Sequence, residues 1–189
     1  MTNRAGRIPG EGGIWALIAG DMLFFTLFFV VFAKAAGVQP AQFAAGHRLL
    51  DAGLGLVNTL LLLMSSLLVA LGVERAKRSG RPARTPIRLA MLCGGGFVIV
   101  KIVEYSAKIA QGITPLSGDF FVYYFAFTGI HLFHVLLGLA ALGWAQSQLA
   151  STPLADDRIA LIESAALFWH LVDLLWIILF ALFYVLEPL

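Results

Sequence analysis

Four ionisable side chains form two pairs with the same spacing inside long apolar stretches of the sequence. The pairs are His131 with His134 and His170 with Asp173. Because residues i and i+3 share a helical face, each pair presents two polar groups on one side of a helix. Three imidazoles and a carboxylate suit zinc or iron, so the pattern gives the hypothesis of a metal site. The alternative is hydrogen bonding between helices, which His and Asp commonly supply in membrane bundles.

Four further charged residues stand in apolar stretches. Lys101 and Glu104 are three residues apart and can pair within one helix, whereas Asp21 has no cationic neighbour at helical spacing. Glu163 lies seven residues before His170. Carboxylates at membrane depth often mark proton paths, which gives the hypothesis of a relay. Paired charges that fix helix registry are the other interpretation, and the sequence leaves both open.

The composition shows which environment surrounds these residues. Of 189 residues, 60% are hydrophobic and 13% are charged, and the mean hydropathy is +0.88. Such values exclude an ordinary soluble domain and predict an integral membrane protein. The net charge of +2 is small and the basic residues are clustered, which indicates membrane topology and not nucleic-acid binding.

Five apolar segments are long enough to cross a bilayer, which takes about 20 helical residues. We therefore predict an all-α bundle of five transmembrane helices, forming a single membrane domain over residues 1–189. Residues 37–46 are rich in Gly, Pro, Gln and Ala and are expected to form a loop. The predicted spans are about 13–36, 52–73, 87–111, 120–145 and 159–186.

Lysine and arginine are divided unequally between the two sides of this bundle. The N-terminus and the second and fourth linkers share one side, and the opposite side carries only Lys34, Arg48 and Lys108. The positive-inside rule then places the N-terminus in the cytoplasm and the C-terminus outside. The residues of the basic side are Arg4, Arg7, Arg75, Lys77, Arg78, Arg81, Arg84, Arg88 and Arg158.

The fourth and fifth predicted spans run in opposite directions, so depth can be counted along both from the cytoplasmic side. This count places His134 level with His170, and His131 level with Asp173 one turn further out. If the two spans pack together, these four side chains form a buried polar ladder. Glu163 then lies nearer the cytoplasmic edge, within reach of the same network.

Four segments carry a specific resemblance. They are GDMLFFTLFF in the first span, KIVEYSAKI in the third, TGIHLFHVLLGL in the fourth and ESAALFWHLVDLLWIILF in the fifth. In this order they resemble the successive motifs of the haem-copper oxidase subunit III family, in its short five-helix form. The resemblance covers nearly the whole chain. It leaves open the branch, since cytochrome c oxidases, quinol oxidases and accessory subunits of nitric oxide reductase all belong here.

The resemblance implies an accessory subunit of an oxidoreductase complex in the bacterial inner membrane. Such a subunit has no catalytic centre, haem or copper of its own and associates with a catalytic subunit I that carries them. Family members hold phospholipid in a cleft between the first two conserved helices and the remaining bundle, and they support proton uptake by their partner. The residue-based alternative is a stand-alone metal-binding or transport protein that uses His131, His134, His170 and Asp173.

Roles for individual residues also follow from the resemblance alone. Asp21 takes the position of the family's membrane-buried carboxyl, where cytochrome c oxidases usually have glutamate, and is expected at the lipid cleft. Glu104 and Lys101 are expected on the facing bundle. The internal polar network is expected to contain His131, His134, Glu163, His170 and Asp173.

Overall fold

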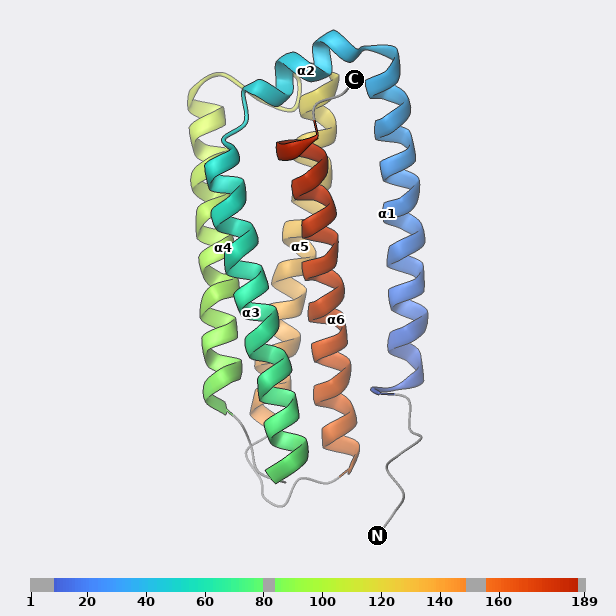
Figure 1. Cartoon of the computed structure of the whole chain (residues 1–189), viewed down its shortest axis with the longest axis vertical. Coiled ribbons are helices and arrows are strands. Elements are labelled where there is room, and N and C mark those ends of the chain that lie inside the picture. Colours follow the sequence, from blue (N-terminus) through green and yellow to red (C-terminus); the bar gives the residue numbers. More distant parts are fainter. Residues whose placement is uncertain (1–8, 80–83, 149–155, 187–189) are drawn as a thin grey trace.

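The computed structural model describes residues 9–79, 84–148 and 156–186, and helices dominate this part of the chain (Figure 1). No strand occurs in these three ranges. Five helices are long and apolar enough to cross a membrane, which confirms the predicted all-α class and the number of spans. They are α1 (Gly12–Val38), α3 (Ala52–Ser79), α4 (Arg84–Ala110), α5 (Asp119–Gln148) and α6 (Asp156–Phe180).

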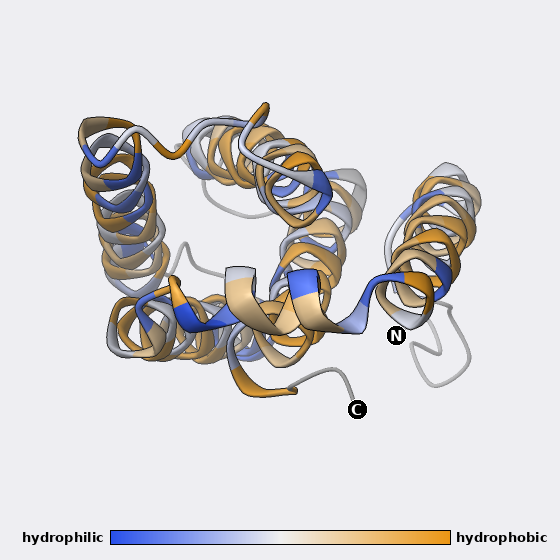
Figure 2. Cartoon of the chain, turned by 90° about the horizontal axis from the view of Figure 1, so that it is seen from above, coloured by the Kyte–Doolittle hydropathy of each residue, from blue (hydrophilic) through white to orange (hydrophobic). Residues whose placement is uncertain are grey.

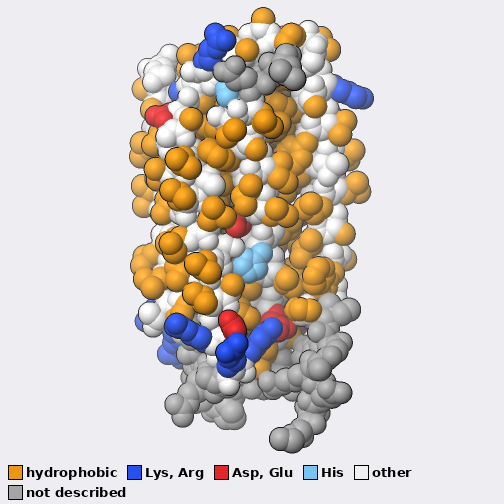
Figure 3. Space-filling model, viewed as in Figure 1, with side chains coloured by type: hydrophobic (Ala, Val, Ile, Leu, Met, Phe, Trp, Pro, Cys, Tyr) orange, Lys and Arg blue, Asp and Glu red, His pale blue; other side chains and the backbone are white. Residues whose placement is uncertain are grey.

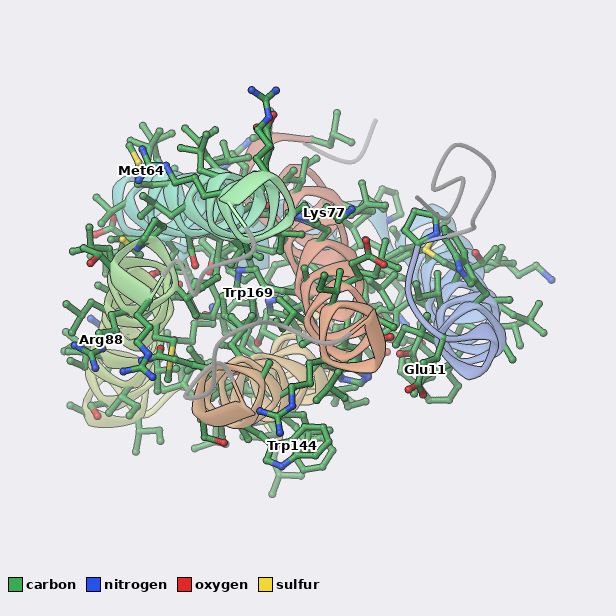
Figure 4. All side chains as sticks on the ribbon, turned by 90° about the horizontal axis from the view of Figure 1, so that it is seen from below. Glu11, Met64, Lys77, Arg88, Trp144 and Trp169 are labelled. Atoms are coloured by element: carbon green, nitrogen blue, oxygen red, sulfur yellow. The ribbon has the colours of Figure 1, made fainter. Side chains whose placement is uncertain are left out.

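Four of these helices form a closed ring. α3 packs against α4 and α6, and α5 packs against the same two helices, so α3 and α5 lie diagonally across the ring (Figure 2). Trp169 of α6 points into the ring, whereas Met64 and Trp144 point outward (Figure 4). Gly94 of α4 and Gly138 of α5 make room for the Trp169 indole, because a Cβ atom at either glycine would lie within 2.8 Å of it. The ring is therefore filled by large side chains.

The first helix, α1, stands outside this ring (Figure 2). Its hydropathy is the highest of the five, yet only 11% of its most apolar window is buried, against 50% in α6. It contacts the bundle through phenylalanines at helical spacing: Phe25 and Phe32 are buried, and Phe28 stacks on Phe127 of α5 at a centroid distance of 5.0 Å. Most of its apolar surface therefore faces lipid or another protein.

A short helix, α2 (Pro40–Arg48), occupies most of the segment that was predicted as a loop, so this prediction is wrong. Pro40 stands at the first helical turn, where its missing N–H costs nothing. Phe43 is fully buried against Phe32, and Gly46 lets the ring of Phe120 approach the α2 backbone closely. Burial of this one face stabilises a helix whose composition alone is typical of a turn.

The last helix changes geometry before it ends. α6 continues into a π-helical turn, η1 (Ala181–Val185), in which Phe183 and Tyr184 are buried. The predicted span ended at residue 186, so its extent agrees with α6 and η1 together. The π turn changes the direction in which the following side chains point.

Charged side chains gather at the two ends of the molecule, and apolar side chains cover the middle (Figure 3). The end where α3 finishes and α4 begins carries Arg75, Lys77 and Arg78 on one helix and Arg84 and Arg88 on the other. This end corresponds to the predicted cytoplasmic side. Arg4, Arg7 and Arg81, on which the orientation prediction also depends, lie outside the described residues.

Candidate functional site

A buried ion pair lies inside the ring, towards its less basic end. The Nζ atom of Lys101 is 2.9 Å from Oε2 of Glu104, three residues later on α4, as the spacing predicted. The same ammonium donates to the hydroxyls of Tyr124 at 3.1 Å and Tyr184 at 2.9 Å, and Tyr184 in turn donates to Oε1 of Glu104 at 2.6 Å. The network therefore joins α4, α5 and η1.

Both charges of this pair are removed from solvent, since the Lys101 side chain is 0% exposed and that of Glu104 is 1%. Four aromatic rings surround the ammonium, with centroids 4.8 to 5.5 Å from Nζ, and so add cation–π attraction. Every donor direction is thus met by a hydroxyl, a carboxylate or a ring. The sequence predicted the ion pair but not Tyr124 and Tyr184, which reach it from distant positions in the chain.

A second acidic group lies where α1 meets α5. Oδ1 of Asp21 is 3.6 Å from Nε2 of His134, and the two side chains are 23% and 14% exposed. Nδ1 of His134 lies 2.8 Å from the carbonyl oxygen of Ile130, which only an N–H can satisfy. Nε2 is therefore the ring nitrogen that faces the Asp21 carboxyl, at a distance longer than a direct hydrogen bond.

No hydrogen bond or ion pair joins the four side chains of the predicted ladder, all of which lie in the described ranges, to one another. His134 turns towards α1, and His170 of α6 turns towards α3, where its Nδ1 lies 2.7 Å from the hydroxyl of Ser66. Asp173, one turn further along α6, is within hydrogen-bonding reach of the same Ser66. His131 packs between the rings of Phe97 and Trp176, at centroid distances of 5.6 and 5.3 Å.

The prediction failed because depth fixes only the height of a residue, and rotation about the helix axis decides which neighbour it faces. The consequence for metal binding is direct. Within residues 9–79, 84–148 and 156–186, no group of three or more His, Cys, Asp or Glu side chains is arranged to hold a metal ion. The hypothesis of a metal site built from His131, His134, His170 and Asp173 therefore loses its geometric basis.

Glu163 lies at the basic end, apart from those histidines. Its carboxylate is 2.5 Å from Nζ of Lys77 on α3 and accepts a hydrogen bond from the backbone N–H of Gly10 at 3.0 Å. The next backbone N–H, that of Glu11, donates to the hydroxyl of Ser164 at 3.0 Å. Glu163 and Ser164 thus tie the beginning of α1 and the end of α3 to α6.

A cavity of about 250 Å³ lies beside this junction. Its polar lining comes from Lys77 and Glu74 of α3 and from Glu163 and His170 of α6, and Figure 4 shows Lys77 directed towards α6. The remaining walls are apolar or carry only backbone, and they consist of Pro9, Ala70, Val73, Ala166 and Leu167. An apolar slot with charged groups at one end fits a molecule that has the same two parts.

The packing of α3 differs from one expectation about the family cleft. The resemblance placed the first two spans together on one side of the cleft, but α3 is part of the ring, and only α1 stands apart. Asp21 lies on the face of α1 that is turned towards α5, and Glu104 lies inside the ring. Asp21 and Glu104 therefore do not face each other across one cleft.

The described geometry is that of a membrane bundle with internal ion pairs, and comparison with known proteins gives it a context. The family model for cytochrome c oxidase subunit III matches residues 10–187. The chain is 32% identical over 180 residues to cytochrome bo(3) ubiquinol oxidase subunit 3 of Pseudomonas putida, covering 92% of this chain and 84% of that protein.

Two other relatives also match over most of this chain and most of their own length. Cytochrome c oxidase subunit 3 of Corynebacterium diphtheriae is 26% identical over 93% of this chain and 87% of its own length. Quinol oxidase subunit 3 of Bacillus subtilis is 26% identical over 89% of this chain and 82% of its own length. The match extends over five helices and their order, not over a single motif. The chain belongs to the cytochrome c oxidase subunit III family.

Proposed function

We propose that this chain is the accessory subunit of a haem-copper oxidase that assembles with catalytic subunit I in the bacterial inner membrane, with its basic end in the cytoplasm. It holds phospholipid beside α1 and supports the stability and proton uptake of the catalytic subunit. Family membership supports the accessory role, since the relatives named above are subunits of quinol or cytochrome c oxidases. The cavity beside the Lys77–Glu163 pair is the observation that carries the lipid-holding role.

The chemistry of that cavity favours a phospholipid. Apolar walls from Ala70, Ala166 and Leu167 accept part of an acyl chain, and Lys77 offers an ammonium to a phosphate. The cavity lies at the basic end of the spans, at the depth where head groups of the cytoplasmic leaflet are found if the orientation prediction holds. Because α1 buries so little of its surface in the bundle, a lipid there also fills the side of α1 that the protein leaves uncovered.

Filling the cavity tests this proposal in the assembled oxidase. Ala70→Phe places a ring among the lining residues, whereas Leu67→Phe places the same ring on the same helix at a position 54% exposed and outside the lining. We expect Ala70→Phe to lower the number of phospholipids that mass spectrometry finds per purified complex. We also expect the variant complex to complete fewer turnovers before it is inactivated. Equal lipid content in both variants and in the unaltered complex would contradict the proposal.

The proton-uptake role is tested at Asp21, the carboxyl at the loosely packed helix. Asp21→Asn keeps the shape of the side chain and removes the carboxyl group that lies 3.6 Å from Nε2 of His134. We expect slower proton uptake from the cytoplasmic side and earlier inactivation during turnover, with the lipid content unchanged. Asp119→Asn, at an exposed carboxylate bonded to Gln39, is the matched control. Uptake rates that are the same in all three proteins would remove Asp21 from the proposal.

A further inference from the structure

Among the buried polar atoms that have no hydrogen-bond partner in the described part of the chain, five belong to three side chains of the ring helices. They are Oδ1 and Nδ2 of Asn58, Nδ1 and Nε2 of His131, and Oδ1 of Asp173. Asn58 and His131 are 0% exposed and Asp173 is 6% exposed, so molecules outside the bundle do not provide their hydrogen-bond partners. The three side chains come from three different helices, α3, α5 and α6.

Trp176 brings these side chains into one neighbourhood. Its indole Nε1 donates to the hydroxyl of Thr59, the residue that follows Asn58, at 3.0 Å. The imidazole of His131 lies against the same indole at a centroid distance of 5.3 Å. Asp173 precedes Trp176 by three residues and so occupies the same face of α6, one turn nearer the basic end. Trp176 therefore contacts His131 and the chain neighbour of Asn58, and Asp173 precedes it by about one turn of α6.

Asn58 and His131 lie on the buried faces of their helices. On α3, Asn58 continues a buried stripe with Leu62, Ser65 and Val69, and Ser65 donates to the carbonyl oxygen of Ala90 on α4 at 2.7 Å. On α5, His131 shares a buried stripe with Val135. Since α3 and α5 lie diagonally across the ring, both stripes face its interior from opposite corners.

The donors and acceptors of this group are complementary to water. An asparagine amide offers two donors and an acceptor, a neutral imidazole offers one of each, and a carboxyl adds an acceptor. Buried polar groups without partners are rare in native proteins, and in a polar, enclosed site ordered water normally satisfies them. Water can donate twice and accept twice, so it can join groups that are too far apart for direct contact.

We propose that ordered water is bound inside the ring beside Trp176 and bridges Asn58, His131 and Asp173. The bridge joins α3 and α5 across the diagonal, where the two helices are not neighbours in the ring. The ammonium of Lys101 lies over the Trp176 ring, at 5.2 Å from its centroid. The bound water therefore extends the polar interior of the ring by about one turn from the Lys101–Glu104 network towards Asp173.

The first test uses the unaltered protein in its assembled complex, so no variant has to fold. An experimental map at a resolution that shows ordered water elsewhere in the membrane region is expected to show density at about 3 Å from His131 and from Asn58 or Asp173. A dry interior at that resolution would overturn the proposal. Direct hydrogen bonds among the three side chains, with no water between them, would also overturn it.

The second test is a double-mutant cycle with shape-conserving changes, Asn58→Leu and His131→Phe. If water bridges the two residues, each single change leaves the bridge incomplete and lowers the melting temperature of the purified complex, and the double variant loses less than the sum of the two shifts. If the atoms have no bound water, the apolar replacements raise the melting temperature, and their effects add. Such an outcome would refute the bridge.

Leu62→Val provides the matched control for that cycle. Leu62 is fully buried one turn from Asn58 on the same stripe of α3, but it has no polar atom to contribute. Combined with His131→Phe, it is expected to give additive shifts in melting temperature. Coupling of the same size in both cycles would assign the non-additivity to general packing and would overturn the bridge.

Discussion

Two regions of this molecule hold ionisable residues at membrane depth in opposite ways. In the ring, Lys101 and Glu104 are 2.9 Å apart, almost completely buried and surrounded by tyrosine hydroxyls and aromatic rings. At the contact between α1 and α5, Asp21 and His134 are 3.6 Å apart and partly exposed. The first pair is closed on every side, and the second is open on one.

This difference in burial determines how much each pair contributes to the stability of the fold. A buried charge that loses its partner cannot recover hydration, so the closed pair makes the ring depend on both residues. At the open pair, nearby water or a lipid head group can compensate for a missing partner, so little stability depends on it. The open pair is correspondingly the one that the surroundings can reach.

The largest effect is expected from breaking the closed pair. Lys101→Met leaves the carboxylate of Glu104 buried without a cation and should lower the free energy of unfolding by about 3–5 kcal/mol, or prevent accumulation of the protein. Thermal unfolding and the yield of folded protein measure this loss. The double variant Lys101→Met/Glu104→Gln should recover much of it. Equal loss in the single and double variants would mean that the pair contributes through packing and not through charge.

A smaller difference is expected between glycines in the two regions. A Cβ atom at Gly138 in the ring would lie 2.6 Å from the Trp169 indole, whereas at Gly20 of α1 it would meet nothing within 4 Å. Gly138→Ala should therefore cost about 1–3 kcal/mol through overpacking, and Gly20→Ala should stay within about 0.5 kcal/mol. Melting temperatures of the two variants compare them directly. A large loss for Gly20→Ala would show that α1 is packed as tightly as the ring.

The smallest effect on stability is expected from the open pair. Asp21→Asn should change the free energy of unfolding by about 1 kcal/mol or less, because both side chains are partly exposed. A cycle with His134→Gln, measured by thermal unfolding, should give a coupling energy of the same small size. A loss comparable to that of Lys101→Met would erase the contrast between the two regions.

The fold was largely predictable because a membrane span is a long apolar segment, which can be recognised from the amino-acid composition alone. Each long helix agrees with its predicted range to within a few residues, apart from the extra turn of α3 that runs through the charged residues Glu74 to Arg78. The short helix α2 was not predictable from its own residues. It depends on burial of Phe43 against Phe32, Phe120 and Tyr123, which are remote in sequence.

The site was predictable only where partners lie on one helix. Lys101 and Glu104 are such a pair, and their contact follows from helical spacing. His134 and His170 are not, because their partners, Asp21 and Ser66, belong to helices whose rotation no local pattern determines. A signal for His134 did exist: Asp21 lacked a cation on its own helix, and a histidine at similar depth was available to meet it.

The links between the start of α1 and α6 have a consequence for biosynthesis. The Gly10–Glu163 and Glu11–Ser164 hydrogen bonds each connect residues 153 positions apart. When the ribosome makes the chain, α1 enters the bilayer before α6, and the side chains that hold its N-terminal end emerge only with α6. The first helix to be inserted is thus the last to be secured, and in that interval its inner face stays accessible to lipid and to subunits that are already assembled.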